Sequence, residues 1–171
     1  MTDLFKHSEA SPFHISVGAV LVNDEGKVLV HKMVRRSMPD SLIHTIGNLN
    51  EAYILMRESL ENGETLDQAV TRGLMEEFGA EGTIVKYLGS IQIPELHAKT
   101  RTFEKTTLYF QVDFVKQNDR PMNDVEAHTE LAWESPEFLI EHMHDQGQRA
   151  GREDLDESKI IKAYIEYGER K

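Results

Sequence analysis

The chain has 171 residues, 39% of them hydrophobic, and a formal net charge of −11. This length suits a single domain with a substantial core, and so negative a surface argues against binding to nucleic acid or acidic membranes unless cations intervene. The sequence contains no cysteine, which excludes disulfides, cysteine-based zinc sites and thiol nucleophiles.

The N-terminal region predicts a polar arm followed by a β-hairpin. Residues 1–12 form the arm and lack the basic-then-apolar pattern of a signal peptide. Residues 14–22 and 27–32 are rich in valine and isoleucine, and the Asn-Asp-Glu-Gly sequence between them favours a turn. No apolar run approaches the roughly 20 residues that a membrane helix needs. We therefore expect a soluble protein of the cytoplasm.

The next region contains the best-defined helix of the sequence. Residues 33–50 are expected to be irregular, residues 53–56 a short buried strand and residues 57–63 a polar loop. Residues 65–78 then predict a helix that ends at Gly79. Thr65 and Gln68 have the spacing of a capping box. The apolar residues of this segment recur at helical spacing and form one stripe, which consists of Leu66, Ala69, Val70, Leu74 and Phe78.

The C-terminal half predicts further strands and then helices. We expect strands at residues 83–93, 106–115 and 130–134, and helices at residues 136–143 and 158–167. Residues 145–171 thus form a charged loop followed by a C-terminal helix. The order of the elements indicates an α/β protein with a mixed sheet covered by helices.

One face of the 65–78 helix could carry chemistry. Positions 73, 76 and 77 share a face roughly opposite the apolar stripe. Glu76 and Glu77 offer oxygen ligands of the kind that hard divalent cations prefer. Arg72 lies four residues before Glu76 and can pair with it. Glu64 can bond Arg72 or stabilise the N-terminus of the helix.

The stretch ESLENGETLDQAVTRGLMEEFGA resembles the signature of the Nudix hydrolases. That signature reads Gly, any five residues, Glu, any seven residues, Arg-Glu, an aliphatic residue, any residue, Glu-Glu, any residue, Gly and an aliphatic residue. The positions that match are Glu64, Arg72, Leu74, Glu76, Glu77 and Gly79. The resemblance covers about residues 12–145. It implies a single domain over residues 1–171 with an α/β/α sandwich, and Mg²⁺ or Mn²⁺ as cofactor.

Two positions depart from the signature. Glu58 stands where the signature opens with glycine, and Gly73 stands where a glutamate follows the arginine. The resemblance implies that Glu76 and Glu77 hold metal, and that the residue replaced by Gly73 would be a further ligand. The side chain of Glu58 could reach the vacated position, although we favour a solvated loop carboxylate. Glycine inside a helix also costs about 1 kcal/mol relative to alanine.

A further ligand or base is expected from the loop before the last strand, because family members often draw one from a comparable loop. Glu126 is the first candidate, ahead of Glu130 and Glu104. For each of the three, an ordinary surface charge is an equal alternative. By the resemblance, Arg72 would orient a glutamate, and Glu64 and Gly79 would support the motif.

Several basic residues are candidates for binding substrate phosphates. Arg57 lies in a segment that resembles a family motif with a basic residue, and Arg35 follows the second strand. Lys99 and Arg101 belong to a basic loop between strands in this otherwise acidic chain. A solvated surface cation is the alternative for each of the four.

Three functions follow for the chain. The first is divalent-metal-dependent hydrolysis of a nucleoside diphosphate linked to another moiety, as the resemblance implies. The second is a Nudix-fold binding or regulatory protein that has lost hydrolysis, for which Gly73 is the motivating residue. The third is an interaction domain in which the motif is accidental. We expect a small-molecule diphosphate as partner, neither nucleic acid nor membrane, and leave a homodimer open.

Overall fold

The computed structural model describes residues 5–8, 11–98, 101–123 and 125–169. Its strands are β1 (Phe13–Val22), β2 (Val28–Val34), β3 (Glu51–Ile54), β4 (Met56–Ser59), β5 (Ala80–Ala98), β6 (Arg101–Gln117) and β7 (Glu130–Glu134). Its α-helices are α1 (Leu66–Gly73), α2 (Pro136–Ala150) and α3 (Ser158–Glu169). Within these described ranges, no helix is long and apolar enough to span a membrane.

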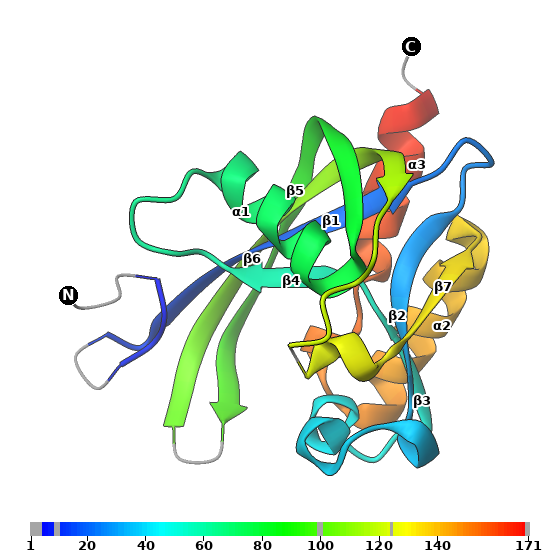
Figure 1. Cartoon of the computed structure of the whole chain (residues 1–171). Coiled ribbons are helices and arrows are strands. Elements are labelled where there is room, and N and C mark those ends of the chain that lie inside the picture. Colours follow the sequence, from blue (N-terminus) through cyan, green and yellow to red (C-terminus); the bar gives the residue numbers. More distant parts are fainter. Residues whose placement is uncertain (1–4, 9–10, 99–100, 124, 170–171) are drawn as a thin grey trace.

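All seven strands belong to one mixed sheet (Figure 1). Five of them follow the order β3-β2-β1-β6-β5, while β4 pairs with β1 and β7 pairs with β2. β1 and β6 run parallel, and the other pairs are antiparallel. β1 changes its antiparallel partner along its length: Leu21 and Val22 pair with β2, whereas residues 16–19 pair with β4. This change brings β4 beside the centre of the sheet, where Glu58 pairs with Val17.

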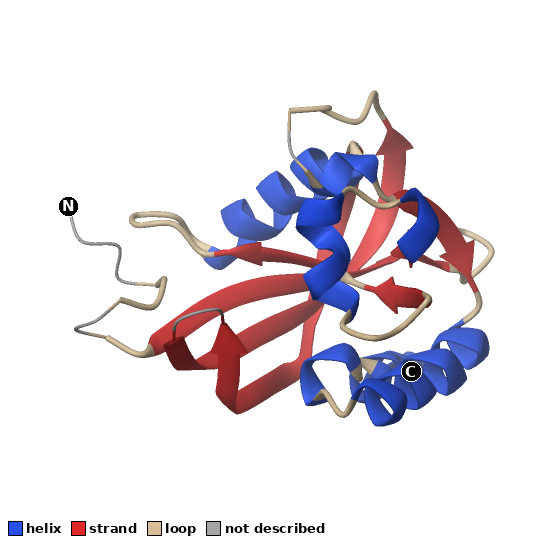
Figure 2. Ribbon diagram, turned by 90° about the horizontal axis from the view of Figure 1, so that it is seen from below, coloured by secondary structure: helices blue, strands red, loops and turns tan. Residues whose placement is uncertain are grey.

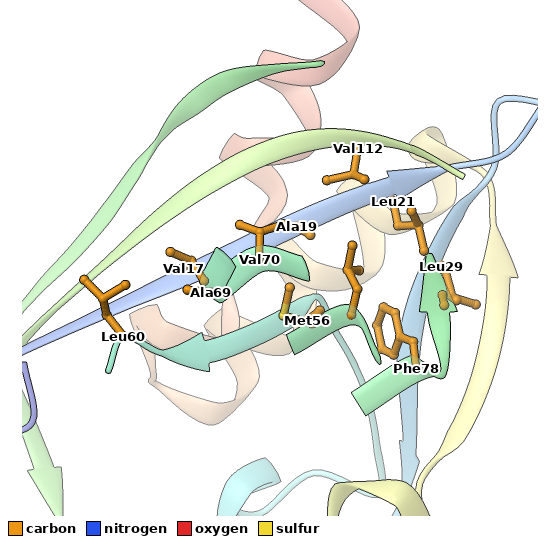
Figure 3. Close-up of a cluster of buried hydrophobic side chains, with 12 residues drawn as sticks. Val17, Ala19, Leu21, Leu29, Met56, Leu60, Ala69, Val70, Phe78 and Val112 are labelled. Carbon is orange, nitrogen blue, oxygen red and sulfur yellow. The ribbon is translucent and has the colours of Figure 1, made fainter. Parts of the chain in front are cut away.

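β1 is buried on both faces, which explains its nearly continuous run of apolar residues. Val17, Ala19 and Leu21 pack with α1 on one side (Figure 3). Val20 and Val22 pack with α2 and α3 on the other side. Helices therefore cover both faces of the sheet (Figure 2). The predicted α/β/α sandwich with a mixed sheet is confirmed.

The helix α2 differs from the sequence prediction. It continues past Met143 to Ala150 and ends at Gly151, whose φ is 62°. The predicted loop 145–157 is therefore confined to residues 151–157. Gly147 lies inside the helix. A Cβ at this position would lie 2.7 Å from the Cβ of Asp156. The glycine lets the following segment pack closely against α2.

Other predicted boundaries also shift. Residues 53–56 belong to two strands that are interrupted at Leu55, whose amide donates to Glu157 at 2.8 Å instead of to a strand. The predicted loop 57–63 begins as part of β4, and β5 and β6 are longer than expected. The irregular residues 33–50 include two short 3₁₀ helices, Arg35–Ser37 and Asp40–Ile46.

Candidate active site

α1 begins with the predicted capping box. The Thr65 hydroxyl accepts from the Gln68 amide at 3.4 Å, and the Gln68 side chain accepts from the Thr65 amide at 2.9 Å. Two amide donors that a helix start leaves without a helical partner are thereby satisfied. The cap fixes the N-terminus of the helix that carries the candidate site.

The C-terminal part of the predicted helix is not α-helical. Leu74–Phe78 form a π-helical turn, which ends at Gly79 with a left-handed φ of 62°. A π turn is wider than an α turn and shifts the register of the residues in it. The turn changes the α-helical spacing on which the predicted shared face of positions 73, 76 and 77 rests. Gly73 is buried, Glu77 is 6% exposed, and only Glu76 is substantially accessible.

Arg72 is the centre of an acidic cluster. Its Nε and Nη2 donate to the two carboxylate oxygens of Glu64, at 2.8 and 3.0 Å. Nη2 also donates to the Ser59 carbonyl at 2.9 Å. Nη1 lies 3.2 Å from Glu76 and 3.3 Å from Glu58. The hydrogen bonds from Arg72 lower the pKa of Glu64, so this bidentate pair is ionised and rigid at neutral pH.

Glu58 lies on β4, and the interpretation of it as a solvated loop carboxylate is wrong. Its side chain is 20% exposed and accepts from the Ser59 amide at 2.8 Å. Burial, followed by the nearby negative charge of Glu77, raises the pKa of Glu58. The strand thus holds a carboxylate whose charge Arg72 balances only in part.

Gly73 is a close-packing position between α1 and β4. A Cβ at Gly73 would lie 2.7 Å from the Met56 Sδ and 2.8 Å from the Glu58 Cβ. Both distances are too short for a side chain to be added without movement. The glycine, which is unfavourable for the helix alone, is therefore required by the contact between helix and strand.

Glu77 is bound within a buried polar chain that begins at His31 on β2. The Nε2 of His31 lies 2.6 Å from a carboxylate oxygen of Glu77, and its Nδ1 lies 2.7 Å from the Thr129 hydroxyl. Burial, and then the charges of Arg120 and Arg57, lower the pKa of His31 to about 3, so the ring is neutral. His31 thus orients Glu77.

Arg120 joins the loop of Glu126 to the end of the π-helical turn. Its guanidinium donates to the backbone carbonyls of Glu77 and Glu126 and, at 2.6 Å, to that of Thr129. Gly79 lies against the same residue, because a Cβ at Gly79 would be 2.7 Å from the Arg120 Cα. The half-buried Glu126 is therefore held beside the residues of the 64–79 motif.

Comparison with known protein families is consistent with this geometry. The family model described as the NUDIX domain matches residues 12–155. The chain belongs to the Nudix family. A comparison with curated protein sequences finds no match.

Solved structures share the Nudix fold at low sequence identity. The solution structure of the E. coli ORF135 protein has a TM-score of 0.63 and 19% identity, covering 97% of this chain and 98% of that one. A NUDIX hydrolase from Nitrosomonas europaea has a TM-score of 0.60 and 19% identity, with coverages of 90% and 88%. A C. elegans Ap4A hydrolase has a TM-score of 0.60 and 14% identity, with coverages of 92% and 98%.

The basic residues predicted to bind substrate are dispersed over the Nudix domain. Arg57 is 15% exposed, donates to the Asp154 carbonyl at 3.0 Å and lies 3.7 Å from Glu157. Arg35 donates to the Leu49 carbonyl at 2.8 Å and to that of Gly47. These two guanidinium groups thus hold the structure together.

The other predicted residues that the structure describes lie on β6 and β7. Arg101 is exposed at the start of β6, and Lys99 lies outside the described residues. Glu104 accepts from Gln92 at 2.7 Å, and Glu130 is exposed at the start of β7.

The chemistry of the donors fits the divalent cation that a Nudix domain implies. The side chains of Glu58, Glu76 and Glu77 are carboxylates, which are ligands of hard cations such as Mg²⁺ and Mn²⁺. Across the described part of the chain, no group of three or more histidine, aspartate or glutamate side chains is arranged to hold a metal ion. The Nη1 of Arg72 contacts both Glu58 and Glu76, so a cation would compete with this nitrogen for their oxygens.

Proposed function

We propose that the chain is a divalent-metal-dependent hydrolase of a nucleoside diphosphate linked to another moiety, acting in the cytoplasm on a small-molecule substrate. The observation that carries the proposal is the cluster in which Arg72 gathers Glu58, Glu64 and Glu76, within a chain of the Nudix family. Glu64 holds the arginine by two hydrogen bonds, so Glu58 and Glu76 can turn to a cation while Arg72 keeps its place.

The proposed ligands of Mg²⁺ or Mn²⁺ are Glu76, Glu77 and Glu58, with Glu126 as a further ligand or base. A bound cation would activate water and neutralise the charge that develops on the diphosphate during P–O bond cleavage. His31 holds the carboxyl group of Glu77 through the 2.6 Å contact of its Nε2. Arg120 fixes the backbone on either side of the site.

Gly79 and Glu64 support the site in different ways. The left-handed Gly79 ends the π-helical turn and allows the backbone of Arg120 to approach. Glu64 aligns Arg72. Among the basic residues, Arg101 is our proposed phosphate contact, because it is exposed at the start of β6. Arg57 and Arg35 are proposed to support the fold, because their guanidinium groups already bind backbone carbonyls.

The experiment is a screen of purified protein with Mg²⁺ or Mn²⁺ against nucleoside diphosphate sugars and dinucleoside polyphosphates, since one structural neighbour is an Ap4A hydrolase. We expect metal-dependent turnover of at least one substrate, and a loss of at least about a hundredfold in Glu77→Gln. Glu61→Gln is the matched control, because Glu61 is 58% exposed and lies 4.0 Å from Arg72. Intact substrates across the panel would refute hydrolysis.

A binding or regulatory protein without hydrolysis is the second candidate. It is favoured by the contacts of Arg72 Nη1 with Glu58 and Glu76, because the positive charge of the guanidinium group already offsets part of the negative charge of these two carboxylates. This candidate expects a nucleoside diphosphate compound to bind in a calorimeter without any product being formed. Turnover by the wild type that Glu77→Gln abolishes would exclude it.

A further inference from the structure

We propose that Glu58 and Gly73 form a reciprocal exchange, in which the metal-binding carboxylate has moved from the helix α1 to the facing strand β4. The sequence signature places glycine at position 58 and glutamate at position 73, and this chain has the two residue types the other way round. The inference rests on the proposed function, because it assigns Glu58 as the substitute for the missing ligand.

The backbone geometry allows a side chain at only one of the two positions. An ideal Cβ on Gly73 would lie 2.8 Å from the Cβ of Glu58, which is shorter than two such atoms approach in proteins. Both atoms are attached directly to the backbone, so rotation of a side chain cannot separate them. Whichever position carries glutamate, the other must be glycine for α1 and β4 to keep this spacing. Gly73 is therefore a consequence of Glu58.

Met56 is the other neighbour of Gly73, but its contact is of a different kind. Its Sδ and Cε would lie 2.7 and 3.2 Å from the added Cβ. These atoms are at the end of an unbranched side chain that can change rotamer. The contact with Met56 can relax, whereas the contact with Glu58 cannot. The decisive conflict is between positions 58 and 73.

The side chain of Glu58 also extends toward the proposed ligands. It begins beside the position that a side chain at Gly73 would take. Its Oε1 lies 3.3 Å from Arg72 Nη1, and the Oε2 of Glu76 lies 3.2 Å from the same nitrogen. The carboxylates of Glu58 and Glu76 thus share one neighbour. The exchange keeps the number of carboxylates in the site and changes only the element that supplies one of them.

The test compares the wild type with Glu58→Gly, Gly73→Glu and the double variant that restores the order of the signature. Two quantities are measured for each full-length protein: Mn²⁺ affinity by calorimetry and the melting temperature in EDTA. Gly73→Glu alone should lower the melting temperature by roughly 3 to 10 °C, because it overpacks the contact between helix and strand. In the Glu58→Gly background, the same substitution should lower it much less.

The affinity for Mn²⁺ should follow the same pattern. Glu58→Gly should bind at least about tenfold more weakly because one carboxylate is lost, and the double variant should recover most of that loss. Glu61→Gln controls for the charge change and should retain the wild-type affinity.

The outcomes separate the exchange from the proposed function. Equal destabilisation by Gly73→Glu in both backgrounds would overturn the exchange, as would a double variant that binds Mn²⁺ no better than Glu58→Gly. If neither the wild type nor the double variant binds Mn²⁺, the proposed metal-dependent function fails and the inference fails with it. If Mn²⁺ binds the double variant but not the wild type, only the role of Glu58 as the replacement metal ligand is refuted.

Discussion

Replacing His31 by leucine should destabilise the protein measurably, because it removes the hydrogen-bond partner of a buried carboxyl group. His31 is 2% exposed, and its Nε2 lies 2.6 Å from Glu77, which is 6% exposed. A hydrogen bond to a charged group contributes about 1.5–3 kcal/mol, and breaking a buried polar pair on one side costs about 3–5 kcal/mol. We therefore expect His31→Leu to lower the free energy of unfolding by about 2–4 kcal/mol.

The assay is urea denaturation at pH 7.5 in EDTA, so that no metal contributes to stability. His31→Leu, Glu77→Leu and their double variant form a thermodynamic cycle. The coupling between His31 and Glu77 should be about 1–3 kcal/mol, since removing both partners leaves neither carboxylate nor imidazole unpaired. A loss below about 0.5 kcal/mol in His31→Leu, or effects that add within about 0.5 kcal/mol, would refute the role of His31 as the residue that orients Glu77.

Three further predictions test the site by other measurements. The pKa of His31 is lowered to about 3 in the folded protein. Between about pH 3 and 6.5, the unfolded chain therefore binds a proton at His31 that the folded protein does not bind. Stability in EDTA should fall as the pH drops below about 6.5, by up to about 1.4 kcal/mol per pH unit, and His31→Leu should flatten this slope; identical slopes would contradict the shift. Gly79→Ala should cost about 2–4 kcal/mol by thermal denaturation, because its φ is 62° and a Cβ meets Arg120 at 2.7 Å. Gly26→Ala, with a φ of 76° and open space, should cost only about 1 kcal/mol, and equal costs would rule out the packing role. Arg72→Lys should lower kcat/KM about a hundredfold, because lysine cannot form the bidentate pair; unchanged kinetics would count against that alignment.

The parts of the fold that depend on local pattern were predictable. The capping box at Thr65, the stop at Gly79 and the apolar run of β1 can all be recognised from residues close in sequence. The family signature supplied Arg72 and Glu64, which the structure pairs at 2.8 Å. These features need no knowledge of distant contacts.

The parts that depend on contacts between distant residues were not predictable. The π-helical turn contains Glu77, which is buried against His31, 46 residues away in sequence. His31 follows three apolar residues in β2, and this polar residue in an apolar strand was the available signal. Gly73 could be seen as a missing ligand, but only the approach of β4 shows why glycine is required.

Arg57 illustrates the same limit for charged residues. Its position in the motif suggested a phosphate contact, but the guanidinium binds the Asp154 carbonyl from 97 residues away. Arg120 had no distinguishing sequence context, although it joins the backbones of Glu77 and Glu126. Long-range partners decide whether an arginine binds substrate or supports the fold.

Metal-dependent hydrolysis is tested most directly by the initial rate of diphosphate cleavage as a function of Mn²⁺ concentration, measured for the wild type and Glu77→Gln in parallel. The wild-type rate should rise from zero in EDTA and saturate with Mn²⁺, and Glu77→Gln should show at least about a hundredfold lower rate at saturation. A wild-type rate that does not respond to Mn²⁺ or Mg²⁺, or a Glu77→Gln rate equal to that of the wild type, would contradict the proposed function.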